Sequence, residues 1–264
     1  MGNEVDAFAK YLANGGQIHY YGNGDGVREF VNAFHPQYMH VDDAPDFFFA
    51  KDDIVILFEH FEFDCYKSTR KGSDHRRELA RIQRKEATIL PTEEGVSFHE
   101  TIHGRSSYED YLGNVTRSFN EHYSHIDQYI NNLRIKGIIS DCTKVKVMFF
   151  IEDVSPLGTA VARNDDGASG IMMVTLADSR EFLDLLAQSS RVDYVLACSS
   201  YNNEQLVWFI DRADLPLYYE HVVEYSAMQF LNFEPHVISY KMLIPDNKLH
   251  ELNEKENEDQ NAIR

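Results

Sequence analysis

Three acidic residues gather at the end of one strongly apolar segment, and their side chains are the first candidates for chemistry. The segment reads PDFFFAKDDIVILFEHFEFD from Pro45 to Asp64, and Glu59, Glu62 and Asp64 close it, with His60 among them. Burying ionised carboxylates is unfavourable unless a cation or hydrogen bonds balance their charge. The pattern therefore leaves two interpretations: a bound metal ion, or a strand that simply emerges into water.

A predicted β-hairpin brings Asp46 toward one of these acids. Residues directly opposite each other in an antiparallel pair point to the same face of the sheet. If Asp52 and Asp53 alone form the turn, Asp46 pairs with Glu59. A three-residue turn would instead put Asp46 on the face of Glu62, because a shift of one residue reverses every side chain. We expect Glu59 as the partner by the first register and keep Glu62 as the alternative.

Apolar periodicity predicts alternating helices and strands along the chain. We expect helices at residues 27–34, 74–87, 107–136 and 179–189, strands at 39–43, 46–51, 54–64, 144–154, 170–176, 193–199 and 205–211, and an irregular segment at 88–106. This alternation predicts an α/β fold with a mixed central sheet flanked by helices. The absence of a glycine/serine linker predicts one domain over residues 1–245, followed by an acidic polar tail at 246–264.

The order helix, three strands, helix, strand resembles the core of the PD-(D/E)XK nuclease superfamily, the restriction-endonuclease-like fold. Asp46 follows a proline where the family places its aspartate, and Glu59 lies near the end of the next strand. Glu29, on the first helix, matches a glutamate that many members add. The resemblance covers about residues 17–153, with the C-terminal strands as an extension over 154–245.

The resemblance implies a metal-dependent nuclease that hydrolyses phosphodiester bonds in DNA or RNA. Asp46 and Glu59, with Glu62 and Glu29, would hold Mg²⁺ or Mn²⁺ through carboxylate oxygens, the ligands that hard cations prefer. The ion would polarise the phosphate and lower the pKa of the attacking water. Asp46, Glu59 and a lysine would then be the catalytic residues, and the lysine that we assign is Lys67.

This chain departs from the family at the lysine of the acid-x-Lys motif. Phe61 stands two residues after Glu59, where the family has lysine. Lys67 or Lys71, in the loop that follows, would have to reach back to the phosphate. Without such a cation the site would bind metal but cleave weakly, or be inactive.

The charge distribution points to a possible nucleic-acid surface. The chain carries a formal net charge of −18, yet the segment from Lys67 to Lys85 contains eight basic and two acidic residues. We expect Lys71, Arg77, Arg81 and Arg84 to contact phosphates, with the arginines on one helix face. A solvated helix face is the alternative interpretation. The second function that we consider is therefore a non-catalytic module that binds nucleic acid or an acidic protein.

Two further motifs have weaker structural support. HETIH, from His99 to His103, matches the HExxH zinc-peptidase motif, which requires two histidines one helical turn apart. Gly104 follows at once, so we do not expect the long helix or bound zinc and rank a peptidase third. YYGNGDG, with glycines at 22, 24 and 26, is either a phosphate-binding loop or a glycine-rich turn.

The remaining features concern location. The three cysteines have no CxxC spacing, which argues against a disulfide framework and against a thiolate zinc site. No apolar run is long enough to span a membrane, and no leader peptide is visible. We expect a cytoplasmic protein without a membrane partner.

Overall fold

The computed structural model describes residues 11, 18–22, 24–33, 38–42, 45–69, 72–73, 77, 80–81, 84, 96–102, 107–155, 159–163, 169–201, 204–225, 229–230 and 236–244. Lys71, His103 and the expected tail lie outside these residues. The chain divides into two compact units: a larger unit of Met1–Cys65 and Ser106–Leu231, and a smaller unit of Tyr66–Arg105 and Asn232–Arg264. Two segments distant in the chain make up each unit, and the expected single domain over residues 1–245 stays a prediction.

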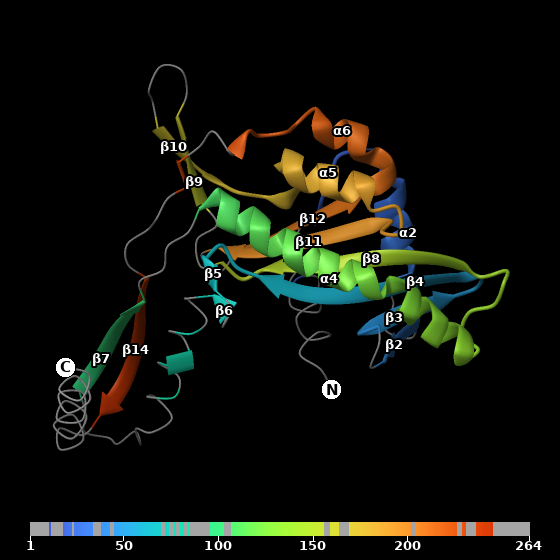
Figure 1. Ribbon diagram of the computed structural model, residues 1–264, viewed down its shortest axis with the longest axis horizontal. Helices are drawn as coiled ribbons and strands as arrows, with labels where there is room; N and C mark the ends of the chain where they lie inside the picture. Colours follow the sequence, from blue (N-terminus) through green and yellow to red (C-terminus); the bar gives the residue numbers. More distant parts are fainter. Residues whose placement is uncertain are drawn as a thin grey trace. The chain divides into compact units, whose positions relative to one another are not determined.

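A seven-stranded mixed sheet forms the centre of the larger unit, in the order β1-β12-β11-β8-β4-β3-β2 (Figure 1). Its strands are β1 Ile18–His19, β2 Met39–Val41, β3 Phe47–Lys51, β4 Ile54–Phe63, β8 Lys144–Asp153, β11 Tyr194–Tyr201 and β12 Glu204–Asp211. Strands β4, β8 and β11 run parallel to one another, whereas β2, β3 and β4 form an antiparallel meander. The expected α/β fold with a mixed sheet is confirmed.

Helices cover both faces of this sheet. They are α2 Asp25–Ala33, α4 Tyr108–Ile135, α5 Arg180–Gln188 and α6 Leu215–Tyr219. On one face, the ring of Phe119 in α4 lies 4.9 Å from Phe149 of β8 and 6.0 Å from Phe182 of α5. On the other face, Phe30 of α2 packs 6.1 Å from Phe58 of β4. Burial on both faces explains why the central strands read as nearly continuous apolar runs.

The connection from β4 through α4 to β8 determines where the chain can build a site. A helical crossover joins two parallel strands, so β4 and β8 end at the same edge of the sheet. Both strands end in acidic residues. The fold therefore gathers carboxylates from two distant segments at one edge.

The β3–β4 turn has two residues, as the first register predicts. Lys51 pairs with Ile54, and Asp52 adopts a positive φ of 55°. Aspartate tolerates this left-handed conformation better than most residues, which suits a two-residue hairpin turn. The three-residue alternative is therefore wrong.

Helix α4 lies close to its expected bounds. Ser107 caps its N-terminus by accepting a hydrogen bond from the Asp110 backbone N–H. The helix continues through Gly113, where no side chain packs within 4 Å of the open Cβ position, so this glycine does not break it. Gly137, with φ of 72°, follows the C-terminus.

Short strands complete the described structure. The larger unit also contains β9 Thr159–Arg163, β10 Ser169–Met173 and β13 Gln229–Phe230; the smaller unit contains β5 Ser68–Thr69, β6 Gly72–Ser73, β7 Val96–Ile102 and β14 His236–Ile244. Strands β7 and β14 pair antiparallel, so the irregular segment expected at 88–106 is wrong for residues 96–102. Within the described residues, no helix has the length and apolar character needed to cross a bilayer.

Candidate metal centre

The hairpin places Asp46 beside the end of β4 that carries Glu59 and His60. Phe47 pairs with Phe58, and Asp46 directly precedes Phe47 in the chain. Burial, followed by the charges of Glu59 and Asp46, raises the pKa of Tyr129 on α4 above its ordinary value. The Tyr129 hydroxyl contacts Glu59 directly, so Glu59 lies on the α4 face of the sheet.

Protein groups already engage both carboxylates. The Asp46 Oδ2 atom accepts a hydrogen bond of 2.7 Å from the backbone N–H of His60. Glu59, 4% exposed, accepts a bond of 2.8 Å from the Tyr129 hydroxyl, and its Oε1 lies 2.7 Å from His122 Nδ1. These bonds reach only Oε1, and Oε2 has no hydrogen-bond partner among the described residues, so they offset the cost of burying the carboxylate only in part. Asp46 and Glu59 therefore have a structural role, which the family resemblance did not predict.

Phe61 has a packing role at the position of the missing lysine. Its ring stacks on the His122 imidazole, with 4.8 Å between centroids and an interplanar angle of 15°. The stack orients the imidazole that contacts Glu59. A lysine here would not form this stack, so the departure from the family motif is part of the packing under α4.

The predicted four-carboxylate metal set is divided between separate places. Side chains alternate along β4, so Glu59 faces α4 while Glu62 faces the opposite side. Glu29 lies beside Lys144, with 3.5 Å between charged atoms, and Lys144 pairs with Ile54 at the start of β4. Five residues of strand, roughly 17 Å, separate that end from Glu59. Glu62 therefore points away from Glu59, while metal binding by Asp46 and Glu59 stays a prediction.

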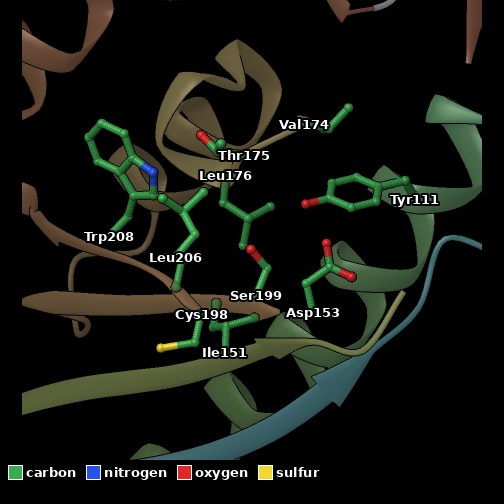
Figure 2. A pocket seen from close by; sticks show the side chains of 11 residues that line it. Tyr111, Ile151, Asp153, Val174, Thr175, Leu176, Cys198, Ser199, Leu206 and Trp208 are labelled. Atoms are coloured by element: carbon green, nitrogen blue, oxygen red, sulfur yellow. The ribbon is translucent and has the colours of Figure 1, made fainter. Parts of the chain in front are cut away.

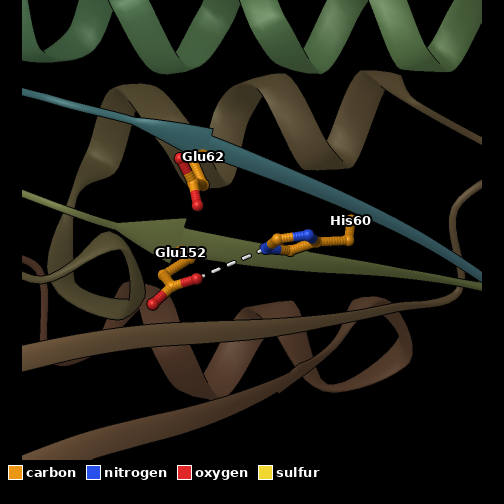
Figure 3. Close-up of side chains that lie close together, drawn as sticks. All are labelled: His60, Glu62 and Glu152. Atoms are coloured by element: carbon orange, nitrogen blue, oxygen red, sulfur yellow. Dashed lines mark ion pairs between the residues drawn. The ribbon is translucent and has the colours of Figure 1, made fainter. Parts of the chain in front are cut away.

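A different cluster has the geometry of a metal site. His60, Glu62 and Glu152 each offer a ligand atom, and these three atoms lie within 4.8 Å of one another. Glu62 of β4 pairs directly with Glu152 of β8, and His60 precedes them on the same face (Figure 3). Within the described residues, this is the group in which at least three His, Cys, Asp or Glu side chains bring ligand atoms within 4.8 Å of one another.

Burial and hydrogen bonding organise this centre. The His60 side chain is 8% exposed and its ring stacks on Phe150 at 4.6 Å. Its Nε2 atom lies 3.4 Å from Glu152 Oε2 but makes no hydrogen bond with the described residues. The buried hydroxyl of Tyr11 donates a 2.8 Å bond to Glu152 Oε1. Glu62 is exposed, so one side of the centre faces solvent.

His60 and Glu152 are the residues that the sequence interpretation missed. His60 stands inside the quoted segment, and Glu152 ends the apolar run KVKVMFFIED. Two apolar strands that both end in acids were a usable signal, because parallel strands joined by a helix end at the same edge. The alternation of side chains then separates His60 and Glu62 from Glu59.

A second acidic group lies on the α4 face at the same edge. Asp153 borders a cavity of about 10 Å³, and its carboxylate and the Tyr111 hydroxyl point toward one another (Figure 2). Burial raises the pKa of Asp153 to about 6, and the charge of Asp64 adds to this increase. Hydrogen bonds from Ser155 and Tyr111 oppose the increase. The cavity has room for about one water molecule, so it is not a substrate pocket.

The remaining predicted residues belong to the smaller unit. Lys67, Arg77, Arg81 and Arg84 are exposed, and the three arginines are helical. The structure does not assign these cations a distance from the carboxylates of the larger unit. Lys71 lies outside the described residues.

The two weaker motifs adopt structures that do not suit their suggested ligands. His99 and Glu100 belong to β7, so the helix that an HExxH zinc site requires is absent there. In the glycine loop, a Cβ at Gly22 would meet the Asp214 carboxylate, and one at Gly26 would meet Asp211. Carboxylates against the loop repel phosphate, which favours the glycine-rich turn.

No protein-family model matches the chain, and no match was found among curated proteins or solved structures. The functional argument therefore depends on the geometry of this chain.

Proposed function

We propose that the protein is a divalent-metal-dependent phosphodiesterase of the nuclease-like class, acting on DNA or RNA. The observation that carries the proposal is the convergence of His60, Glu62 and Glu152 at the C-terminal ends of two parallel strands. Ligands of open α/β sheets commonly bind at this edge. Within the larger unit the elements run α2, β2, β3, β4, α4 and β8, with β5, β6 and β7 of the smaller unit inserted after β4, and this order supports the same class because the sequence resemblance is based on it.

The residues of the centre would have distinct roles. His60 and Glu152 would bind the ion from the buried side, and the exposed Glu62 from the side open to substrate. Asp46 would hold the backbone of His60 through its 2.7 Å hydrogen bond. The ion would polarise the phosphate and activate water. If only the carboxylate ligands are considered, this ion would be Mg²⁺ or Mn²⁺.

The test is metal-dependent cleavage of single- and double-stranded DNA and RNA by protein first stripped with a chelator. We expect Glu62→Gln and Glu152→Gln to reduce the cleavage rate by about 100-fold or more, since metal polarisation contributes several kcal/mol. Glu121→Gln is the matched control, because Glu121 is exposed on α4. No cleavage of any substrate with Mg²⁺ or Mn²⁺, or full activity in Glu62→Gln, would contradict the proposal.

A second candidate function is a non-catalytic nucleic-acid-binding module. The exposed Arg77, Arg81 and Arg84 favour it. In the larger unit, Lys136 pairs with Asp42, Lys146 with Asp193 and Arg191 with Asp127.

Binding measured in chelator separates this candidate from the nuclease. Replacing one arginine that contacts a phosphate with alanine should reduce the slope of log affinity against log salt concentration by about 0.7 to 0.9. Arg191→Ala is the control. An unchanged slope in the triple alanine variant of Arg77, Arg81 and Arg84 would exclude these arginines as phosphate-binding residues.

A further inference from the structure

The donor atoms of the centre carry information about the ion. Its ligands are one imidazole nitrogen, from His60, and carboxylate oxygens from Glu62 and Glu152. Mg²⁺ binds oxygen almost exclusively and retains several waters, whereas imidazole suits zinc and other transition metals. Zinc accepts both histidine nitrogen and glutamate oxygen in a three-ligand site.

The nitrogen is buried and directed into the cluster. His60 Nε2 has no hydrogen-bond partner among the described residues, and only 8% of the His60 side chain is exposed. A buried polar atom without a hydrogen bond is unfavourable by about 1–3 kcal/mol. Its contact with Glu152 Oε2, the dashed line in Figure 3, is 3.4 Å long and is not a hydrogen bond. An ion bound between them would satisfy both atoms.

Tyr11 prepares Glu152 for the same role. Its hydroxyl occupies Oε1, so Oε2 is the oxygen directed at His60. Outer hydrogen bonds of this kind orient metal ligands in proteins. The Tyr11 ring also packs edge-on against Phe150, 6.1 Å between centroids, on which His60 stacks. Tyr11, Phe150 and His60 thus form one packed arrangement around the ligand atoms.

Repulsion between like charges gives a second reason for a cation. Glu62 and Glu152 are directly paired neighbours on adjacent strands, and like charges in such positions repel. A divalent ion would neutralise both carboxylates at once.

We infer that this centre is a site for a nitrogen-binding transition-metal ion, Zn²⁺ or Mn²⁺ rather than Mg²⁺, with His60 Nε2 as a ligand and Tyr11 as the positioning residue of Glu152. The inference rests on the metal centre of the proposed function but not on hydrolysis. Zn²⁺ binds more tightly than Mn²⁺, following the general order for nitrogen and oxygen sites.

The test begins with chelator-stripped full-length protein, titrated with Zn²⁺, Mn²⁺ and Mg²⁺ separately against a chromophoric chelator. We expect one equivalent of Zn²⁺ to bind, Mn²⁺ to bind more weakly, and millimolar Mg²⁺ not to displace either. In the Mn²⁺ complex, pulsed EPR should detect coupling to one ¹⁴N nucleus. Equal competition by Mg²⁺, or a complex without nitrogen coupling, would overturn the inference.

Two tyrosine variants test the positioning role. Tyr11→Phe removes the hydroxyl on Glu152, and Tyr129→Phe removes the equivalent hydroxyl on Glu59 across the sheet. Loss of an outer hydrogen bond to a ligand costs about 10- to 100-fold in metal affinity, so Tyr11→Phe should weaken Zn²⁺ binding by this factor. The affinity of Tyr129→Phe should remain that of the wild type. Equal effects of the two variants would overturn the role of Tyr11.

A ligand variant separates the possible failures. His60→Phe keeps the stack on Phe150 but removes the nitrogen, and it should weaken Zn²⁺ binding more than Tyr11→Phe does. Nitrogen coupling in the wild-type complex provides the same evidence if this variant does not fold. Metal binding as expected, without cleavage of nucleic acid, would overturn the proposed hydrolysis and leave this inference standing. A wild-type protein that binds none of the three ions would overturn both.

Discussion

Replacing Asp153 with asparagine should remove a pH-dependent loss of stability in the larger unit. Burial raises the pKa of this carboxyl from its ordinary 3.8 to about 6. The folded state therefore holds the proton more tightly than the unfolded chain. The resulting contribution to stability is fully present below pH 3.8 and is lost as the pH rises through 6.

The magnitude follows from the difference between the two pKa values. At about 1.4 kcal/mol per pKa unit, the change from 3.8 to about 6 corresponds to about 3 kcal/mol. Other carboxylates also titrate in this range, so the informative quantity is the wild-type free energy of unfolding minus that of Asp153→Asn. We expect this difference to fall by about 2 kcal/mol between pH 4 and pH 7, because the unfolded chain is already partly ionised at pH 4.

Urea unfolding at pH 4, 5, 6 and 7 in chelator measures this difference. The protein has one tryptophan, Trp208, and it lines the same cavity as Asp153, so its fluorescence reports on this region. Asp141→Asn, at an exposed turn, is the control and should leave the pH profile of the wild type unchanged. A difference that stays constant with pH, or that rises, would refute the argument from burial.

Three further predictions follow from the same structure. Glu62→Gln should raise the stability of the metal-free protein by about 0.2–1 kcal/mol in urea unfolding, because it removes repulsion from Glu152. It should also reduce the rise in Tm on adding Zn²⁺. A less stable metal-free variant would contradict this. Gly26→Ala should cost about 1–3 kcal/mol by thermal unfolding, since the added Cβ meets the Asp211 carboxylate; a variant of wild-type Tm would show that this loop relaxes freely. Ser107→Ala should cost about 1 kcal/mol in urea unfolding through loss of the α4 cap, and no change would mean that the cap is dispensable.

The two faces of β4 explain why one acidic segment contributes to two different environments. Glu59, toward α4, is held by Tyr129 and His122, and it stabilises the packing of that helix. Glu62, on the other face, is paired with Glu152 and is exposed to solvent. Only the second environment exposes a ligand to solvent, so we propose that chemistry takes place there.

Local patterns in the sequence were sufficient for the elements themselves. The apolar stripe and the serine cap predict helix α4, and the two-residue turn at Asp52 sets the register in which Phe47 pairs with Phe58. Side-chain alternation within β4 separates Glu59 from Glu62. These features depend on interactions between residues close in the chain, which periodicity and turn chemistry describe.

Tertiary structure alone decided the composition of the metal centre. The register of β4 with β8 brings Glu62 beside Glu152, a residue far along the chain, and the packing of Tyr11 against Phe150 directs the Glu152 carboxylate. Pairing of β7 with β14 likewise joins two segments distant in the chain within the smaller unit. Strand partners distant in sequence are chosen by the burial of whole faces, so no local pattern of residues contains this information.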